Sequence, residues 1–316
     1  MSKHAFLSPS ASHRWLNCPP SAKLCAEVPD QSSPYAQQGT CAHELCAYLV
    51  EKALGRDVKD PTENLNYYDS EMQQCAEGYA AFVMKEYEKA KQTCPDPEVL
   101  IEQKVYFSKW VEGGTGTADC IILADGTAEI IDYKHGLGVL VSAESEEFGG
   151  NPQLMCYCLG FLAMFDGIYD IDTVKMAIYQ PRRENVSIHT MSKDELLKWA
   201  EETLAPTALL AMEGKGEFAA GDHCQFCRVK ATCRKRAEYN LELARYDFQM
   251  PDTHAGYDPY DRSVKGITAM TKLLDKKKFD ELLGSLTFKP QGKPTLVPKS
   301  DKRPAMKNSA QEDFKE

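Results

Sequence analysis

The stretch GTADCIILADGTAEIIDYKHG, residues 116–136, contains two apolar runs separated by Asp125-Gly126. Short apolar runs rich in β-branched residues predict strands at residues 117–123 and 128–134, and Asp-Gly between them is a strong hairpin signal. A two-residue type I′ turn at Asp125 and Gly126 pairs Ala124 with Thr127. Five residues further along each strand, Asp119 then faces Asp132 directly.

This register predicts a metal-binding patch. Lys134 lies two residues beyond Asp132 and therefore projects from the same face of the strand. Opposed carboxylates among apolar neighbours such as Ile121 and Ile130 destabilise a sheet unless a cation is present, and oxygen ligands suit Mg²⁺ or Mn²⁺. Such a site suits phosphodiester hydrolysis. The alternative is a solvated sheet face whose acids are merely exposed. The metal site also depends on the register, which a slip of one residue would change.

The segments around the hairpin alternate between helical and extended patterns. Their order predicts an α/β domain with a mixed central β-sheet flanked by helices, spanning residues 1–284. Residues 285–316 are rich in Lys and Pro and predict a flexible tail. The expected helices are residues 36–54, 69–92, 151–165 and 192–213, and the further strands are residues 98–107 and 172–180.

The composition is that of a globular chain, with 43% hydrophobic and 27% charged residues. No apolar run approaches the roughly 20 residues that span a bilayer, and residues 1–12 show no signal-peptide pattern. We therefore expect a cytoplasmic protein without membrane association. The net charge of −10 argues against a protein that coats nucleic acid through bulk charge, but it leaves a local basic path possible.

Five segments resemble, in order, the motifs of the RecB/AddB branch of the PD-(D/E)xK nucleases. The whole pattern is most similar to a phage-encoded family known only as a domain of unknown function. The segments are LSPSASHRWLNCPPSA (residues 7–22), GTCAH (39–43), GTAD (116–119), IIDYKHG (130–136) and NPQLMCY (151–157).

The resemblance implies a restriction-endonuclease-like core and a role for each matched residue. Asp119 and Asp132 would bind the metal, His43 would complete its coordination, and the Tyr133 carbonyl would be a further ligand. Lys134 would activate water. The matched helical motif adds Gln153 and Tyr157, which would support the site or contact DNA. Glu129 points to the opposite face by strand alternation and is not counted as a ligand.

Three cysteines lie close together in the pattern Cys224-x2-Cys227-x5-Cys233. With His223 as a fourth ligand they predict a zinc site. The resemblance supplies Cys18 instead, which implies a [4Fe–4S] cluster that joins the N-terminal and C-terminal segments. The other eight of the 12 cysteines are interpreted as small buried hydrophobic residues.

Basic residues follow the second of these cysteines and predict a track for the DNA backbone, with a solvated helix face as the alternative. The resemblance further implies an exonuclease of phage recombination or DNA processing, in the phage or bacterial host cytosol, with a single-strand annealing protein as a partner. The rivals are a non-catalytic nucleic-acid-binding module of the same fold and a zinc-stabilised interaction protein. The basic residues are Arg228, Lys230, Arg234, Lys235 and Arg236.

Overall fold

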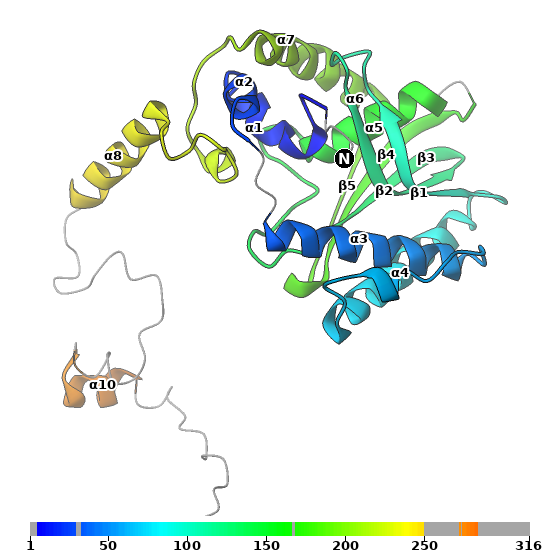
Figure 1. Cartoon of the computed structure of the whole chain (residues 1–316), viewed down its shortest axis with the longest axis horizontal. Helices are drawn as coiled ribbons and strands as arrows, with labels where there is room; N and C mark the ends of the chain where they lie inside the picture. The colour runs from blue at the N-terminus through cyan, green and yellow to red at the C-terminus, as the bar shows by residue number, and fades with distance from the viewer. Residues whose placement is uncertain (1–4, 30–32, 166–167, 250–271, 273, 284–316) are drawn as a thin grey trace, which may run out of the picture. The chain divides into compact units, whose positions relative to one another are not determined.

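Figure 1 shows the computed structural model of the chain, which describes residues 5–29, 33–165, 168–249, 272 and 274–283. Internal contacts divide the chain into two units, Met1–Asp247 and Phe248–Glu316. The described part of the second unit includes helix α10, Lys276–Leu283, in which Phe279 is buried. The tail predicted for residues 285–316 lies outside the described residues.

The centre of the first unit is a five-stranded sheet whose spatial order, β1-β2-β3-β4-β5, follows the order in the sequence. Neighbouring strands are antiparallel except β3 and β4, which are parallel. The mixed α/β class is therefore confirmed. The strands are β1 (Glu98–Tyr106), β2 (Thr115–Ala124), β3 (Gly126–Tyr133), β4 (Ile171–Gln180) and β5 (Asn185–Ser192).

The register predicted for the β2–β3 hairpin is confirmed from Ala124↔Thr127 to Cys120↔Ile131. The predicted type I′ turn is wrong. That turn requires a positive φ at both central residues, whereas only Gly126, at 76°, has one. The register survives because one left-handed residue is enough to reverse the chain here, and glycine adopts that conformation without a steric penalty.

Helices cover both faces of the sheet (Figure 1). One buried core lies under α3 and α4, and a larger one lies under α5, α6, α7 and the N-terminal helices. The bounds are η1 (Pro9–Ala11), α1 (Ser12–Asn17), α2 (Ser21–Ala26), α3 (Pro34–Ala53), α4 (Ser70–Ala90), α5 (Pro152–Phe165), α6 (Lys193–Trp199), α7 (Ala205–Glu213), η5 (Asp222–Cys224) and α8 (Arg234–Gln249).

The helices that flank the hairpin begin at side-chain caps. Ser33 accepts a hydrogen bond from the Ala36 N–H before α3, and Asp69 accepts one from the Met72 N–H before α4. Asn151 accepts one from the Gln153 N–H at the start of α5. These caps fix where each helix starts, and hence which side chains face the sheet.

Two elements differ from the sequence prediction. Strand β5 was not predicted, although it forms the edge of the sheet beside β4. The single helix expected over residues 192–213 is divided into α6 and α7 by a π-helical turn at Ala200–Leu204. Pro206 follows this turn, and because proline has no backbone N–H, the regular hydrogen-bond ladder cannot run through it.

A buried ion-pair network joins α4 to the sheet. Lys175 Nζ lies 2.7 Å from Glu86 Oε2 and 3.0 Å from Glu129 Oε1. Lys89 contacts the other Glu86 oxygen at 2.7 Å. Glu86 is only 2% exposed, so its charge depends on these partners. The network also confirms that Glu129 points away from the Asp132 face.

Among the described residues, no helix combines the length and the apolar character needed to cross a membrane.

Candidate functional site

The two acids of the hairpin lie one step beyond its last recorded pair, where β2 and β3 run side by side. The Tyr133 backbone N–H donates to Asp119 Oδ2 at 2.7 Å. Asp132 is 2% exposed, and the apolar residues Ile121 and Ile130 of the same face are fully buried. The predicted convergence of the two carboxylates on one patch among apolar residues is therefore present.

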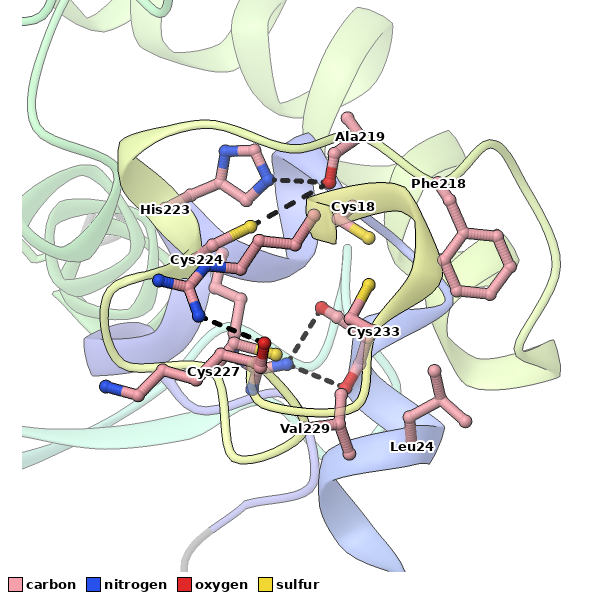
Figure 2. A pocket seen from close by; sticks show the side chains of 13 residues that line it. Cys18, Leu24, Phe218, Ala219, His223, Cys224, Cys227, Val229 and Cys233 are labelled. Atoms are coloured by element: carbon pink, nitrogen blue, oxygen red, sulfur yellow. Dashed lines mark hydrogen bonds between the residues drawn. The ribbon is translucent and has the colours of Figure 1, made fainter. Parts of the chain in front are cut away.

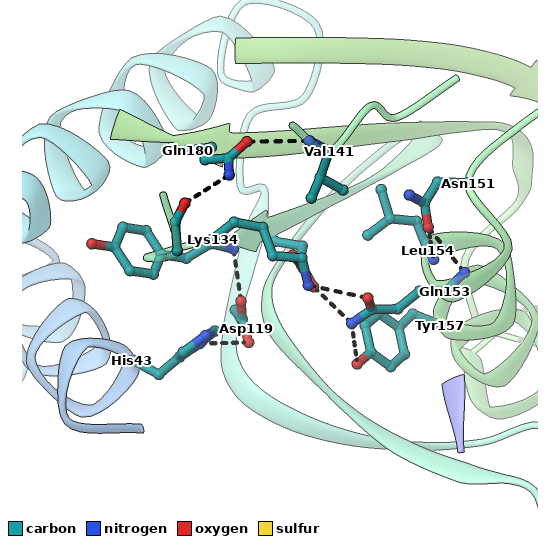
Figure 3. Close-up of polar contacts among 12 residues, drawn as sticks. His43, Asp119, Lys134, Val141, Asn151, Gln153, Leu154, Tyr157 and Gln180 are labelled. Carbon is teal, nitrogen blue, oxygen red and sulfur yellow. Dashed lines mark hydrogen bonds and ion pairs between the residues drawn. The ribbon is translucent and has the colours of Figure 1, made fainter. Parts of the chain in front are cut away.

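Helix α3 brings His43 to this patch. His43 Nδ1 lies 3.2 Å from Asp119 Oδ1, and Figure 3 shows the imidazole directed at that carboxylate. Burial lowers the pKa of His43, but the Asp119 charge raises it more, so the pKa of His43 lies above its ordinary value. Conversely, burial raises the pKa of Asp119, but His43 and the Tyr133 N–H bring it below its ordinary value. Asp119 is therefore a carboxylate at neutral pH.

Lys134 and helix α5 hold the other acid. Lys134 Nζ lies 2.8 Å from Asp132 Oδ2 and donates to Gln153 Oε1 at 3.1 Å (Figure 3). Gln153 Nε2 donates to Asp132 Oδ1 at 3.1 Å and to the Tyr157 hydroxyl at 3.0 Å. Burial lowers the pKa of Lys134, but the neighbouring Asp132 raises the pKa above its ordinary value, so the amine stays protonated. Burial raises the pKa of Asp132 itself.

The loop that follows Lys134 is fixed by Gln180, the last residue of β4. Gln180 is 1% exposed, and its amide donates to the carbonyls of Gly136 and Val139 at 2.8 and 2.7 Å. Its oxygen accepts from the Val141 N–H at 3.2 Å (Figure 3). Sequence reasoning missed this residue because a single polar side chain at a strand end carries no distinctive signal.

Glu102 is a further acid of the site that sequence reasoning missed. On β1 it stands opposite Asp119, between the recorded pairs Ile101↔Cys120 and Gln103↔Ala118. Its φ of 49° is left-handed, an unfavourable conformation for a non-glycine residue within a strand. Loss of solvation and the Asp119 charge raise the pKa of Glu102 to about 7. Aligning β1 with β2 in the sequence so that residue 102 pairs with residue 119 would have identified Glu102.

The donor set fits a hard divalent cation. Ligand atoms of His43, Glu102 and Asp119 all lie within 4.8 Å of one another. Asp132 is outside this group of three. Its buried Oδ2 lies 2.8 Å from Lys134 Nζ, so in this structure the lysine is the cation that faces this oxygen. An imidazole nitrogen and several carboxylate oxygens are ligands that Mn²⁺ and Mg²⁺ accept.

The strain at Glu102 makes a prediction about stability. In metal-free protein, Glu102→Gly should raise the free energy of unfolding by about 1 kcal/mol relative to Glu102→Ala, because only glycine relieves the left-handed conformation. Both variants lose the carboxylate, so the comparison isolates the backbone. Urea unfolding measures the difference. Equal stabilities would show that the conformation at residue 102 costs nothing.

Gly116, in the GTAD motif, is required for close packing. A Cβ atom at this position would lie 2.6 Å from Tyr157 Cε1 and 2.8 Å from Pro9 Cγ. The absence of a side chain therefore lets the Tyr157 ring lie against β2, where its hydroxyl accepts from Gln153.

We expect Gly116→Ala to lower the free energy of unfolding by about 1–3 kcal/mol through overpacking. Gly138→Ala is the matched control, because a Cβ atom there would have no heavy atom within 4 Å. Denaturant unfolding of both variants tests this. Equal losses for the two substitutions would show that close packing does not require a glycine at residue 116.

The predicted cysteines line one pocket in the first unit (Figure 2). Cys18, Cys224 and Cys227 are buried and Cys233 is partly exposed. The pocket is therefore bounded by the N-terminal segment and by the late cysteine loop, as a four-thiol site requires. His223, the zinc alternative, also lines the pocket, and its Nε2 lies 3.1 Å from the Ala219 carbonyl oxygen. Burial raises the pKa of Cys227 to about 11, so this thiol is protonated when nothing is bound.

The basic residues after Cys227 are divided in their contacts. Three of them donate to backbone carbonyls: Arg228 to Cys25 and Val28, Lys230 to Gln225, and Arg236 to Lys230. Arg234 pairs with Glu238 along α8, and Lys235 is exposed. Part of the predicted DNA track therefore also holds the cysteine loop together.

Comparisons with known proteins add a family and one structural likeness. A solved structure titled "Crystal structure of SSO0001" is 15% identical in sequence, covers 63% of this chain and 98% of that chain, and superposes with a TM-score of 0.28. This score is too low to establish a shared fold. The model of one protein family matches residues 4–255 and 252–304. The chain belongs to that family, which is described as "Protein of unknown function (DUF2800)".

Proposed function

We propose that this protein is a metal-dependent DNA nuclease with a restriction-endonuclease-like core of the PD-(D/E)xK class. The observation that carries the proposal is the convergence of His43, Asp119, Asp132 and Lys134 on one patch, where Gln153 bridges the last two. Two neighbouring carboxylates, one paired with an imidazole and the other with a protonated amine, suit hydrolysis of a phosphodiester.

The residues of the site have two roles: some would bind the metal ion, and Lys134 holds a proton. His43, Asp119 and Glu102 would hold a Mg²⁺ or Mn²⁺ ion, with Asp132 beside them and the Tyr133 carbonyl as a further ligand. When bound, such an ion polarises a phosphate oxygen and acidifies water. Lys134 holds a proton beside the carboxylates and offers positive charge to the phosphate.

Gln153 and Tyr157 orient the lysine. Gln153 accepts from Lys134 Nζ and donates to Asp132, so it fixes both side chains relative to each other. Tyr157 accepts from Gln153 and is only 7% exposed, which keeps water away from the α5 side of the network. The pair acts by positioning.

We further propose that Cys18, Cys224, Cys227 and Cys233 hold a [4Fe–4S] cluster that stabilises the fold. Support comes from their shared pocket, which supplies four thiols without His223. We also propose that the protein acts as an exonuclease in phage recombination and that its partner is a single-strand annealing protein. Exposed Arg234 and Lys235 remain candidates for contacts with DNA phosphates.

The test is cleavage of end-labelled single- and double-stranded DNA by the full-length chain, with Mg²⁺, with Mn²⁺ and with chelator. We expect cleavage with either metal and none with chelator. Binding of DNA without cleavage would favour a non-catalytic module. Visible absorbance and metal analysis of anaerobically purified protein separate an iron–sulfur cluster from zinc, and zinc without DNA binding would favour an interaction protein.

A further inference from the structure

A fifth cysteine lies against the cysteine pocket. Cys25 is on α2, and its Sγ atom lies 3.7 Å from the Sγ atom of Cys227. Both side chains are buried, with exposed fractions of 4% and 7%. The two residues are 202 positions apart in the sequence, so only the tertiary fold brings them together.

The backbones that carry these two thiols are fastened to each other. Arg228, the residue after Cys227, donates to the Cys25 carbonyl at 3.2 Å and to the Val28 carbonyl at 3.3 Å. Cys227 is also held by its N–H, which donates to the Cys224 carbonyl at 3.1 Å. Because both segments are fixed, the two sulfur atoms remain neighbours. A disulfide bond is about 2.05 Å long, so the side chains must bring the sulfur atoms closer together, while the two backbone segments can stay in contact.

We propose that Cys25 is a resolving thiol, which forms a reversible disulfide with Cys227 when the cysteine pocket is empty. The disulfide withdraws Cys227 from the four-thiol site and prevents loading until it is reduced. Formation of the disulfide is independent of the proposed nuclease activity. Its effect on loading rests on the proposed four-cysteine site.

A hydroperoxide is the oxidant that this step requires. The Cys227 sulfur, after it loses its proton, attacks hydrogen peroxide and breaks the O–O bond, giving a sulfenic acid at Cys227 and one water. The Cys25 sulfur then attacks this sulfenic sulfur, forms the S–S bond and releases a second water. Two electrons pass from the sulfurs to the peroxide, and the two thiol protons end in water. A dithiol reverses the reaction by exchange.

Peptide mapping tests the disulfide directly. Full-length chain is emptied of metal by chelation under anaerobic, reducing conditions, treated with hydrogen peroxide and alkylated. Trypsin with a Glu-specific protease releases Cys25 in a peptide of its own, residues 24–27, and fragmentation separates Cys224 from Cys227. We expect a Cys25–Cys227 link that dithiothreitol removes. A link from Cys227 to Cys18, Cys224 or Cys233 instead would overturn the proposal.

Cobalt uptake tests the consequence for loading. Reduced protein should bind Co²⁺ with a thiolate absorption band, peroxide-treated protein should lose the band, and dithiothreitol should restore it. Reduced Cys25→Ser should bind Co²⁺ as the natural chain does. If this variant binds less, Cys25 is a ligand and the resolving role is wrong. Full Co²⁺ binding by the disulfide form would also contradict it.

The controls separate this proposal from the proposed function. Cys94→Ser removes another buried cysteine and should leave both the link and the cobalt band unchanged. A reduced protein that binds no Co²⁺ but forms the Cys25–Cys227 link would contradict the four-cysteine site and support the disulfide. Circular dichroism of each variant confirms that it is folded before mapping.

Discussion

Asp132→Asn is expected to reduce Mn²⁺-dependent DNA cleavage by at least about 100-fold, a loss typical of removing one electrostatic group from an active site. Asparagine keeps the shape of aspartate, and its oxygen can still accept from Gln153. It lacks the charge that holds Lys134 Nζ at 2.8 Å and that would face a cation. The measurement is the initial rate of nucleotide release from end-labelled DNA at saturating Mn²⁺.

Two further variants make this result specific. Asp125→Asn changes an exposed acid at the turn of the same hairpin and should cleave at the rate of the natural chain. Asp132→Glu restores the charge and should recover part of the activity. If Asp132→Asn and the natural chain cleave equally, the cleavage comes from another site or from a contaminating nuclease, and the proposed site is wrong.

Lys175→Met should lower the free energy of unfolding by about 3–5 kcal/mol, because the buried Glu129 then loses its ion pair while Glu86 keeps its contact with Lys89. Lys175 contacts two carboxylates, Glu86 and Glu129, which are 2% and 7% exposed. Methionine fills much of the same volume, so the loss is electrostatic rather than a cavity. Urea unfolding at neutral pH measures it.

The pH dependence of this loss has a definite sign. Burial raises the pKa of Glu86, but the contacts with Lys175 and Lys89 lower it more, so the pKa of Glu86 lies below its ordinary value of 4.5. The natural chain therefore gains stability from Glu86 above pH 4.5 and loses it as the pH falls through the lower folded value. In Lys175→Met the buried acids can protonate instead, so the difference between the two proteins should shrink towards pH 4.5.

Lys89→Ala and Lys85→Ala are the matched controls. Lys89 contacts Glu86 from a position that is 52% exposed, so its removal should cost about 1 kcal/mol or less. Lys85 is exposed on the same helix and should have no measurable effect. Equal losses for Lys175 and Lys85 would show that the buried network does not contribute to stability.

The sequence predicted the parts of the site that depend on local chemistry. Asp125-Gly126 reverses the chain over two residues, so counting residue pairs outward from this turn was enough to place Asp119 opposite Asp132. Glu102 was missed because its approach depends on the pairing of β1 with β2 and on a left-handed residue that no local pattern announces. Cys25 was correctly predicted to be buried, but its contact with Cys227 exists only in the tertiary fold.

Strand β5 shows a different limit. Its residues NVSIHTMS alternate in exposure, as in a strand, but the outward side chains Val186 and Ile188 are apolar and the inward ones are polar or partly exposed. The usual contrast between an apolar inner face and a polar outer face is therefore absent. The helix at residues 192–213 was predicted in type and length, whereas its π-helical turn depends on how the chain accommodates Pro206.

The strict sequential order of the five strands has a consequence for biosynthesis. Each strand emerging from the ribosome meets its neighbour already formed, so the sheet can grow from one edge to the other without waiting for a distant partner. Cys18 is the exception. It lines a pocket with Cys224, Cys227 and Cys233, which are translated after all five strands, so the N-terminal segment meets the cysteine loop only once the whole sheet has emerged.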